Sequence, residues 1–211
     1  MRRVRKVAAA VLLVPGAAAA EPVVIAALGD SLTAGYGLPV NDGFVPQLQR
    51  WLADRGADVE LRNAGVSGDT TRGGLSRAAW TLTDDVDAMI VTLGGNDLLR
   101  GIDPAAAKAN LAGILQVAAE AGVEVLMFPM TAPGNYGPDY KRDFDAMYGE
   151  VAAEYEALLG PGFLAPLTAS ADPAEAVVLM QPDGIHPSAQ GVAVIVEGLG
   201  PSVLELIARL D

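Results

Sequence analysis

The chain has 211 residues, of which 51% are hydrophobic and 19% charged, a size and composition that suit one folded domain. It has no cysteine and one histidine, which excludes disulfides, cysteine-based metal sites, a cysteine nucleophile, a lipidated-cysteine anchor and a multi-histidine metal site. The net charge of −12 argues against nucleic acid as a partner, because phosphate backbones bind basic surfaces.

Residues 1–20 have the pattern of a secretory signal peptide. A basic start is followed by a short apolar run over 7–14 and by three alanines before Glu21. The run is too short to span a bilayer, so we expect export to the periplasm, or secretion, without stable membrane insertion. The alternative is an uncleaved amphipathic N-terminus. Removal of these residues takes away four positive charges and no negative ones, which changes −12 to −16 and leaves residues 21–211 as the folded domain.

The rest of the chain alternates short apolar runs with segments of helical periodicity. The runs contain little polar alternation and end at Gly or Pro, which is typical of strands buried on both faces. In chain order the predicted elements are a strand at 23–28, a helix at 45–53, a strand at 59–61, a helix at 71–82, a strand at 88–93, a helix between Pro104 and Gly122, a strand at 123–130, a helix at 143–159, a strand at 163–164 and a helical stretch at 189–210. Gly200-Pro201 in the last stretch predicts a kink or two pieces.

This alternation predicts an α/β fold with three layers, in which helices cover both faces of a parallel sheet of about five strands. Five strands are too few for an eight-stranded barrel. Ligands of open parallel sheets bind in the crevice beyond the carboxyl ends of the strands. The functional residues are therefore expected in the loops that follow the strands.

Four polar clusters lie at predicted strand ends or before the last helix. They are Gly29-Asp30-Ser31-Leu32, residues 63–70, Gly94-Gly95-Asn96-Asp97, and Asp183-Gly184-Ile185-His186-Pro187. Helix capping explains each cluster alone, and we expect Asp30, Asp69 and Asp97 mainly to cap helices. Capping does not explain why serine, aspartate, histidine and bare glycines all gather at one edge of the sheet.

Ser31 and His186 are the candidates for nucleophilic catalysis. A serine hydroxyl is a poor nucleophile unless a neighbouring base takes its proton. A lone histidine is more often an ordinary surface or core residue, but His186 lies in a polar loop with Asp183 three residues before it. A carboxylate at that spacing can bond the far ring nitrogen and stabilise the imidazolium. We therefore expect a catalytic triad of Ser31, His186 and Asp183, with activity falling in mild acid as the imidazole protonates.

The same reasoning supplies candidates for an oxyanion hole. Acyl transfer passes through a tetrahedral oxyanion that needs preorganised hydrogen-bond donors. Gly68 offers a backbone N–H without a side chain in the way, Asn96 offers a side-chain amide, and the N–H of Ser31 is a third donor.

These four blocks resemble the SGNH (GDSL) hydrolase superfamily over nearly the whole mature chain, from Gly29 to Pro187. The resemblance implies a flavodoxin-like fold, Ser31 as nucleophile, Gly68 and Asn96 as oxyanion donors, and Asp183 and His186 as the rest of the triad. The longer forms of the motifs are most similar to the periplasmic branch that contains acyl-CoA thioesterase I/lysophospholipase and arylesterases. This resemblance implies that the chain is a serine esterase that hydrolyses acyl or aryl esters, and thioesters, through an acyl-enzyme.

The resemblance also bears on the substrate. Pro133-Gly134-Asn135-Tyr136-Gly137 resembles a loop near the acyl groove of that branch, although the family usually has Ala where Gly134 stands. Apolar residues near the motif ends are groove candidates or ordinary core. They are Leu32, Tyr36, Leu38, Leu98, Met130, Tyr136 and Ile185, and the substrate-binding residues we expect are Leu32, Asn135, Tyr136 and Ile185. No basic cluster suggests a coenzyme A site, so a small-molecule or lipid ester is favoured as the substrate.

Three alternatives remain open from the sequence. A carbohydrate O-deacetylase would use the same triad on acetyl esters alone. A non-catalytic exported binding protein would keep its ligand affinity in Ser31→Ala. A nucleotide-binding domain is disfavoured because the first strand is not followed by Gly-x-Gly-x-x-Gly and no Gly-Lys dipeptide of a P-loop occurs. We expect neither a metal nor a cofactor.

Overall fold

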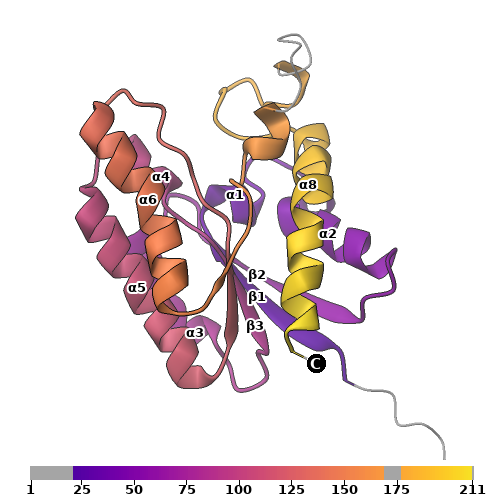
Figure 1. Cartoon of the computed structure of the whole chain (residues 1–211). Helices are drawn as coiled ribbons and strands as arrows, with labels where there is room; N and C mark the ends of the chain where they lie inside the picture. Colours follow the sequence, from indigo (N-terminus) through magenta and orange to yellow (C-terminus); the bar gives the residue numbers. More distant parts are fainter. Residues whose placement is uncertain (1–20, 169–176, 211) are drawn as a thin grey trace, which may run out of the picture.

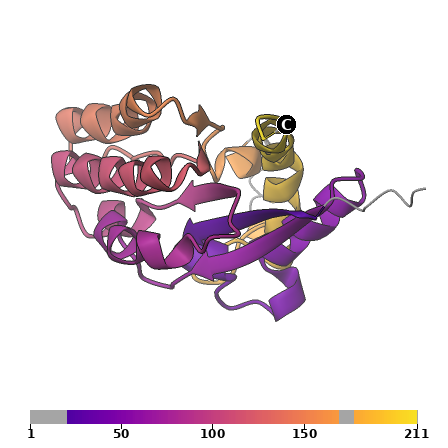
Figure 2. The same cartoon turned by 90° about the horizontal axis from the view of Figure 1, so that it is seen from below.

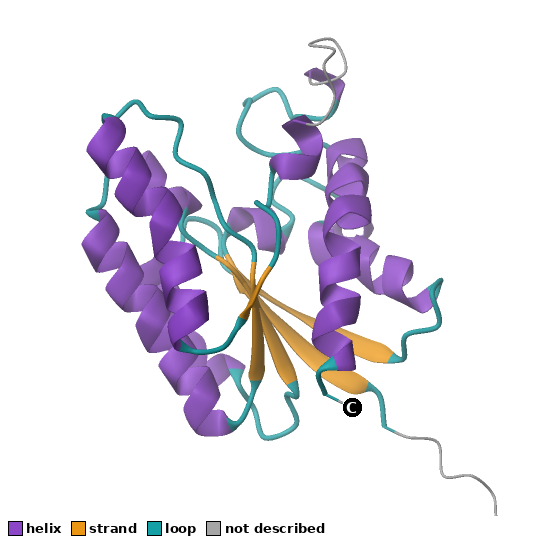
Figure 3. Ribbon diagram, in the orientation of Figure 1, coloured by secondary structure: helices purple, strands orange, loops and turns teal. Residues whose placement is uncertain are grey.

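The structure, a computed structural model, describes residues 21–168 and 177–210, so the predicted signal peptide lies outside the described residues. Its five strands pair in parallel in the order β2-β1-β3-β4-β5. Figure 3 shows the strands in the middle of the molecule, between the helices. The strands are β1 (Val23–Gly29), β2 (Val59–Gly65), β3 (Ala88–Thr92), β4 (Glu124–Met127) and β5 (Leu158–Leu159). The predicted parallel α/β sheet is confirmed.

Helices cover both faces of this sheet (Figures 1 and 2). The helices are α1 (Ser31–Ala34), α2 (Phe44–Ala53), α3 (Thr71–Thr81), α4 (Gly95–Leu99), α5 (Pro104–Ala121), α6 (Pro138–Glu154) and α8 (Ala189–Ala208), with 3-10 turns at Val40–Asp42 and Ala165–Thr168. Helices α2 and α8 pack on one face, and α3, α5 and α6 pack on the other. Successive residues of β1 alternate between the two cores, with Ala26 and Leu28 in one and Ile25 and Ala27 in the other.

The strand order places a crevice beside the end of β1. From β1 the chain moves outward to β2, and it then returns to β3 on the other side of β1. The connections after β1 and β3 therefore lead to opposite faces of the sheet, and the carboxyl ends of these two strands form the switch point at which such sheets bind ligands. Ser31 follows β1 and Asn96 follows β3, so the topology brings two of the predicted clusters to this point.

Two predicted elements differ from the structure near the fifth strand. Phe163 and Leu164 are not a strand, since β5 is Leu158–Leu159 and Phe163 instead packs its ring edge-on against Phe44, with centroids 5.1 Å apart. Helix α6 begins at Pro138, earlier than predicted, and ends at Glu154. It ends there because Glu156 adopts a left-handed backbone with φ of 55°, which no helix can continue.

Helix α8 is one continuous helix that contains Pro201, so the prediction of two separate pieces is wrong. Gly200 has a packing role, because a Cβ at this position would overlap the ring of Trp51 on α2. Among the described helices, α8 alone is long and apolar enough to cross a membrane. The apolar composition of α8 is explained by its packing on the sheet, since Ile195, Leu199 and Val203 are fully buried in the core.

The edge strand β2 is protected by a side chain. Gln49 of α2 donates from Nε2 to the carbonyl of Val59 at 2.7 Å and accepts the N–H of Leu61 on Oε1 at 2.7 Å. A residue of a further parallel strand would make the same two bonds. The amide of Gln49 therefore occupies a pairing position that an exposed edge offers to other chains.

Gln49→Ala is expected to lower the free energy of unfolding by about 1 kcal/mol, because two hydrogen bonds to the edge strand are lost. It should also increase self-association at high protein concentration, since the edge is then open to pairing. Urea unfolding and size-exclusion chromatography measure the two effects. Gln116→Ala is the matched control, because Gln116 is exposed on α5 and bonds only Glu120. Equal behaviour of the two variants would contradict the role of Gln49.

Candidate active site

Helix α1 lies unusually close to the strand ends, and this closeness sets the position of Ser31. A Cβ on Gly29 would overlap the hydroxyls of Thr33 and Thr92, which bond each other across the buried junction of α1 and β3. A Cβ on Gly65 would overlap the backbone of α1 at Ala34. Two strand ends without side chains therefore allow a short helix to sit directly on the sheet edge, with Ser31 as its first residue.

The structure brings Ser31, His186 and Asp183 together. The Oγ of Ser31 lies 2.9 Å from Nε2 of His186, and Nδ1 of His186 lies 2.7 Å from Oδ2 of Asp183. This geometry fits an imidazole whose Nδ1–H donates to Asp183 and whose Nε2 accepts the proton of Ser31. The ring of Tyr36 lies against the imidazole, with centroids 4.6 Å apart. The three sequence-predicted residues thus form one hydrogen-bonded chain.

The loop of Asp183 and His186 is a tight local turn. Oδ1 of Asp183 accepts the backbone N–H groups of Ile185 at 2.9 Å and His186 at 3.0 Å. These bonds, led by the N–H of His186, lower the pKa of Asp183 to about 2. The turn is closed by an isolated antiparallel bridge between Met180 and Pro187. The expectation that this loop follows a strand of the sheet is wrong, because no sheet strand precedes it directly among the described residues.

The three residues expected to supply oxyanion donors, Ser31, Gly68 and Asn96, all line one cleft. Asn96, in the first turn of α4, donates from Nδ2 to Oδ2 of Asp30 at 3.1 Å, which leaves its second amide hydrogen for the cleft. Within the described part of the chain, the N–H groups of Ser31 and Gly68 have no protein acceptor. The carbonyl of Gly68 accepts a bond from Arg100 at 2.8 Å, which holds this loop against α4.

Asp30 is a buried carboxylate behind the serine. It caps α1 by accepting the N–H of Leu32 at 3.0 Å, as expected, and it also orients Asn96. Burial raises the pKa of Asp30, and these two hydrogen bonds act in the opposite direction. Asp30 therefore links helix α1, which carries Ser31, to Asn96.

The other two aspartates do not cap their own helices as expected. Thr70 caps α3, and Asp69 instead binds Arg77 with 2.6 Å between Oδ2 and Nε. Asp97 lies inside α4, fully buried, and accepts both the N–H and the hydroxyl of Thr71 at the start of α3, at 2.8 and 2.6 Å. Asp97 thus caps a neighbouring helix and ties α4, which carries Asn96, to α3.

Ser31 and His186 open onto a cleft of about 640 Å³. The described residues that line it are mostly apolar, and none of them is Lys or Arg. Leu32 and Ile185 line the cleft as expected, together with Tyr36, Leu98 and Met130. Three of the expected residues do not line it: Leu38 lines a separate depression, and Asn135 and Tyr136 lie in the loop before α6, where Tyr136 packs on Tyr140 and over Gly101.

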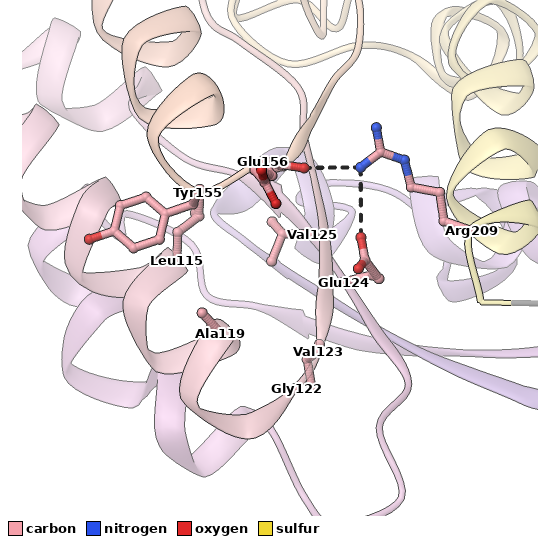
Figure 4. A pocket seen from close by; sticks show the side chains of 10 residues that line it. Leu115, Ala119, Gly122, Val123, Glu124, Val125, Tyr155, Glu156 and Arg209 are labelled. Carbon is pink, nitrogen blue, oxygen red and sulfur yellow. Dashed lines mark hydrogen bonds and ion pairs between the residues drawn. The ribbon is translucent and has the colours of Figure 1, made fainter.

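A second cavity, of about 380 Å³, lies at the opposite end of the sheet beside the start of β4 (Figure 4). Arg209 crosses it, donates to the carbonyl of Glu156 at 3.0 Å and approaches Glu124 at 3.7 Å. In the part of the chain that the structure describes, no serine, threonine or histidine lines this cavity. Across the described residues, no group of three or more acidic or histidine side chains could hold a metal ion. The chemistry is therefore concentrated at the cleft.

Comparison with known proteins assigns the family. Residues 27–194 match the GDSL-like lipase/acylhydrolase family. The chain belongs to this family. Esterase TesA of Pseudomonas aeruginosa is 40% identical over 199 residues, which cover 94% of this chain and 95% of that protein. Thioesterase 1/protease 1/lysophospholipase L1 of Escherichia coli is 34% identical over 203 residues, which cover 93% and 90%. The psychrotrophic esterase EstA from Pseudoalteromonas sp., solved in a form inhibited by monoethylphosphonate, has a TM-score of 0.79 at 28% identity and covers 88% of this chain and 98% of its own.

The family and branch predicted from the sequence are thereby confirmed. Two residues that hold the backbone around the site were not predicted from the sequence. Arg77 binds the carbonyls of Gly29 and Ala64 at the ends of β1 and β2, and Gln181 bonds the carbonyl of Tyr36. No local pattern marks these two side chains, because each bonds backbone carbonyls of distant residues.

Asp183 should contribute to stability in a pH-dependent way. Its pKa is lowered from 3.8 to about 2 in the fold, so its contribution is fully present above pH 4 and is lost as the pH falls toward 2. The difference in unfolding free energy between wild type and Asp183→Asn should therefore shrink between pH 5 and pH 2. Urea unfolding at several pH values measures this difference. The other carboxylates contribute equally to the unfolding free energy of both proteins, so their contributions cancel when one value is subtracted from the other. A difference that stays constant over this range would contradict the assignment.

Proposed function

We propose that this protein is a serine esterase that hydrolyses acyl or aryl esters, and thioesters, with Ser31 as nucleophile, His186 as general base and acid, and Asp183 as the group that orients His186. The observation that carries the proposal is the continuous chain from Ser31 through His186 to Asp183, with bonds of 2.9 and 2.7 Å, at the mouth of an apolar cleft. Membership in a family with esterase relatives supports it.

In the first step His186 takes the proton of Ser31 as Oγ attacks the ester carbonyl. The oxyanion forms beside the N–H groups of Ser31 and Gly68 and the amide of Asn96, and losing one such donor typically costs about 2.7–4 kcal/mol of barrier. The ionised carboxylate of Asp183 stabilises the imidazolium that forms. The carbon–oxygen bond to the leaving group then breaks as His186 returns the proton to that oxygen.

In the second step water attacks the acyl-enzyme. His186 takes a proton from the water, the same donors hold the second oxyanion, and the bond to Ser31 breaks as its oxygen regains a proton. No other group is needed for either proton transfer. The acid leaves and the site returns to its starting state.

The cleft favours an apolar acyl group over a charged headgroup. Leu32, Leu98, Met130 and Ile185 line it, and no Lys or Arg is among its lining residues in 21–168 and 177–210. The net charge of −12 also disfavours a strongly anionic substrate such as coenzyme A thioesters as the main one. A fatty-acyl ester of a small alcohol or of a lipid fits these features.

We propose in addition that residues 1–20 are a signal peptide and that the mature enzyme begins at Glu21 in the periplasm or outside the cell. The basic, apolar and small-residue pattern supports this. Mass spectrometry of protein from the periplasmic and extracellular fractions should find a chain that starts at Glu21. A chain starting at Met1 in every fraction would refute the proposal.

Initial rates on p-nitrophenyl esters from acetyl to palmitoyl test the function. The mature protein should hydrolyse the esters, and Ser31→Ala should reduce kcat by about 10⁴-fold or more, because no other nucleophile replaces the hydroxyl. The optimum is expected at a medium or long acyl chain, since the cleft is large and apolar.

Two outcomes would redirect the assignment. Activity on the acetyl ester alone would favour a carbohydrate O-deacetylase. Equal inactivity of wild type and Ser31→Ala on every ester, with ligand affinity intact in the variant, would favour a binding protein.

A further inference from the structure

The residues proposed to exchange a proton come from opposite ends of the chain. Ser31 and His186 are 155 residues apart, and the bond between their side chains is 2.9 Å long. Such a bond requires that helix α1 and the loop of His186 keep a fixed distance. Something must join the loop of His186 to the segment that follows Ser31.

Gln181 makes that connection with its side-chain amide. One hydrogen of Nε2 points to the carbonyl of Tyr36 at 2.8 Å and the other to the carbonyl of Pro187 at 3.0 Å. Tyr36 belongs to the nucleophile segment, since its own N–H donates to the carbonyl of Ser31 at 3.0 Å. Pro187 is the residue after His186. One planar amide therefore fixes the two segments relative to each other.

The backbone of Gln181 also bonds the backbone of the His186 loop. Its N–H donates to the carbonyl of His186 at 2.7 Å, and its carbonyl accepts the N–H of Gly184 at 3.0 Å. The two donors of its amide and both backbone groups are thus used within or across this loop. A residue with only a structural role in one loop would not need bonds to both segments.

The side chain of Gln181 fits here because the neighbouring residue Gly37 has no side chain. Oε1 of Gln181 lies over Gly37, where a Cβ would overlap it, and Gly37 has a left-handed backbone with φ of 74°. The ring of Tyr36, whose carbonyl Gln181 binds, lies against the imidazole of His186. Gln181 therefore fixes both the histidine backbone and the aromatic ring beside the histidine.

We propose that Gln181 is a positioning residue that sets the distance between Ser31 and His186. It touches neither the substrate nor the proton in transit, and it acts through the two segments that it joins. This inference rests on the proposed function, because it assumes that His186 serves Ser31 as a base.

Gln181→Glu is the sharpest test. The carboxylate has nearly the same shape, but it cannot donate to the carbonyls of Tyr36 and Pro187. We expect kcat on a p-nitrophenyl ester to fall by about 10- to 100-fold, since small displacements of catalytic groups have effects of this order. KM should change less than twofold, because Gln181 does not line the cleft. Gln181→Ala should show the same division between kcat and KM.

Controls separate this effect from unfolding and from failure of the proposed function. Rates are measured well below the Tm of each variant, with Gln116→Ala as the matched glutamine change on a distant helix. The rate at which an organophosphonate modifies Ser31 provides a second readout, and it should fall with kcat in the Gln181 variants.

Three results are decisive. Variants with wild-type kcat overturn the inference while the esterase stands. A loss of kcat in Gln181→Glu that disappears when rates are corrected for the folded fraction also overturns it. A wild type without Ser31-dependent hydrolysis refutes the proposed function itself, and the inference falls with it.

Discussion

The site depends on how closely α1 approaches the carboxyl ends of β1, β2 and β3. Gly29 and Gly65 end two of these strands without side chains, and the backbone and hydroxyls of α1 fill the space. Any larger residue at either position would lift the helix from the sheet. Because Ser31 is the first residue of this helix, such a displacement would move the proposed nucleophile away from His186 and from the proposed donors together.

Buried polar groups extend this close packing to the neighbouring helices. Asp30 joins α1 to Asn96 on α4, and Asp97 joins α4 to Thr71 on α3. Among the described residues, no buried side-chain nitrogen or oxygen lacks a hydrogen-bond partner. A carboxylate buried without partners would be costly, so each of these aspartates fixes the position of the groups that it binds. Hydrogen bonds to Asp30 and Asp97 therefore hold Asn96 and the two neighbouring helices in place around the proposed oxyanion hole.

Much of this arrangement could be predicted from the sequence because the signals are local. Ser31 follows β1 directly, Asn96 follows β3 within a few residues, and Asp183 and His186 lie in one turn. In a parallel sheet, the position of a residue just after a strand is enough to place it at the functional edge. The fold class and the positions of Ser31 and Asn96 therefore needed no knowledge of long-range contacts. The loop of Asp183 and His186 follows no described strand directly, so its place beside Ser31 was expected from the resemblance of its motif and not from the strand order.

The features that could not be predicted depend on distant partners or on backbone conformation. Gln181 and Arg77 bind carbonyls, and every residue has a carbonyl, so nothing in the sequence identifies their partners. Strand β5 has only two residues and follows a helix, and its pattern is that of a helix end. The left-handed backbone of Glu156, which ends α6, carries no sequence signal, because Gly or Asn is the usual residue in that conformation.

The distance along the chain between Ser31 and His186 has a consequence for synthesis. A chain made from its N-terminus carries the serine 155 residues before the histidine, and β1 cannot hold α1 in place until β2 and β3 have paired with it. Closing a loop of this length costs conformational entropy, which the contacts of the folded domain must offset. Hydrolysis and completion of the fold therefore coincide, and a growing or unfolded chain would be chemically silent toward the esters of the compartment in which it is made.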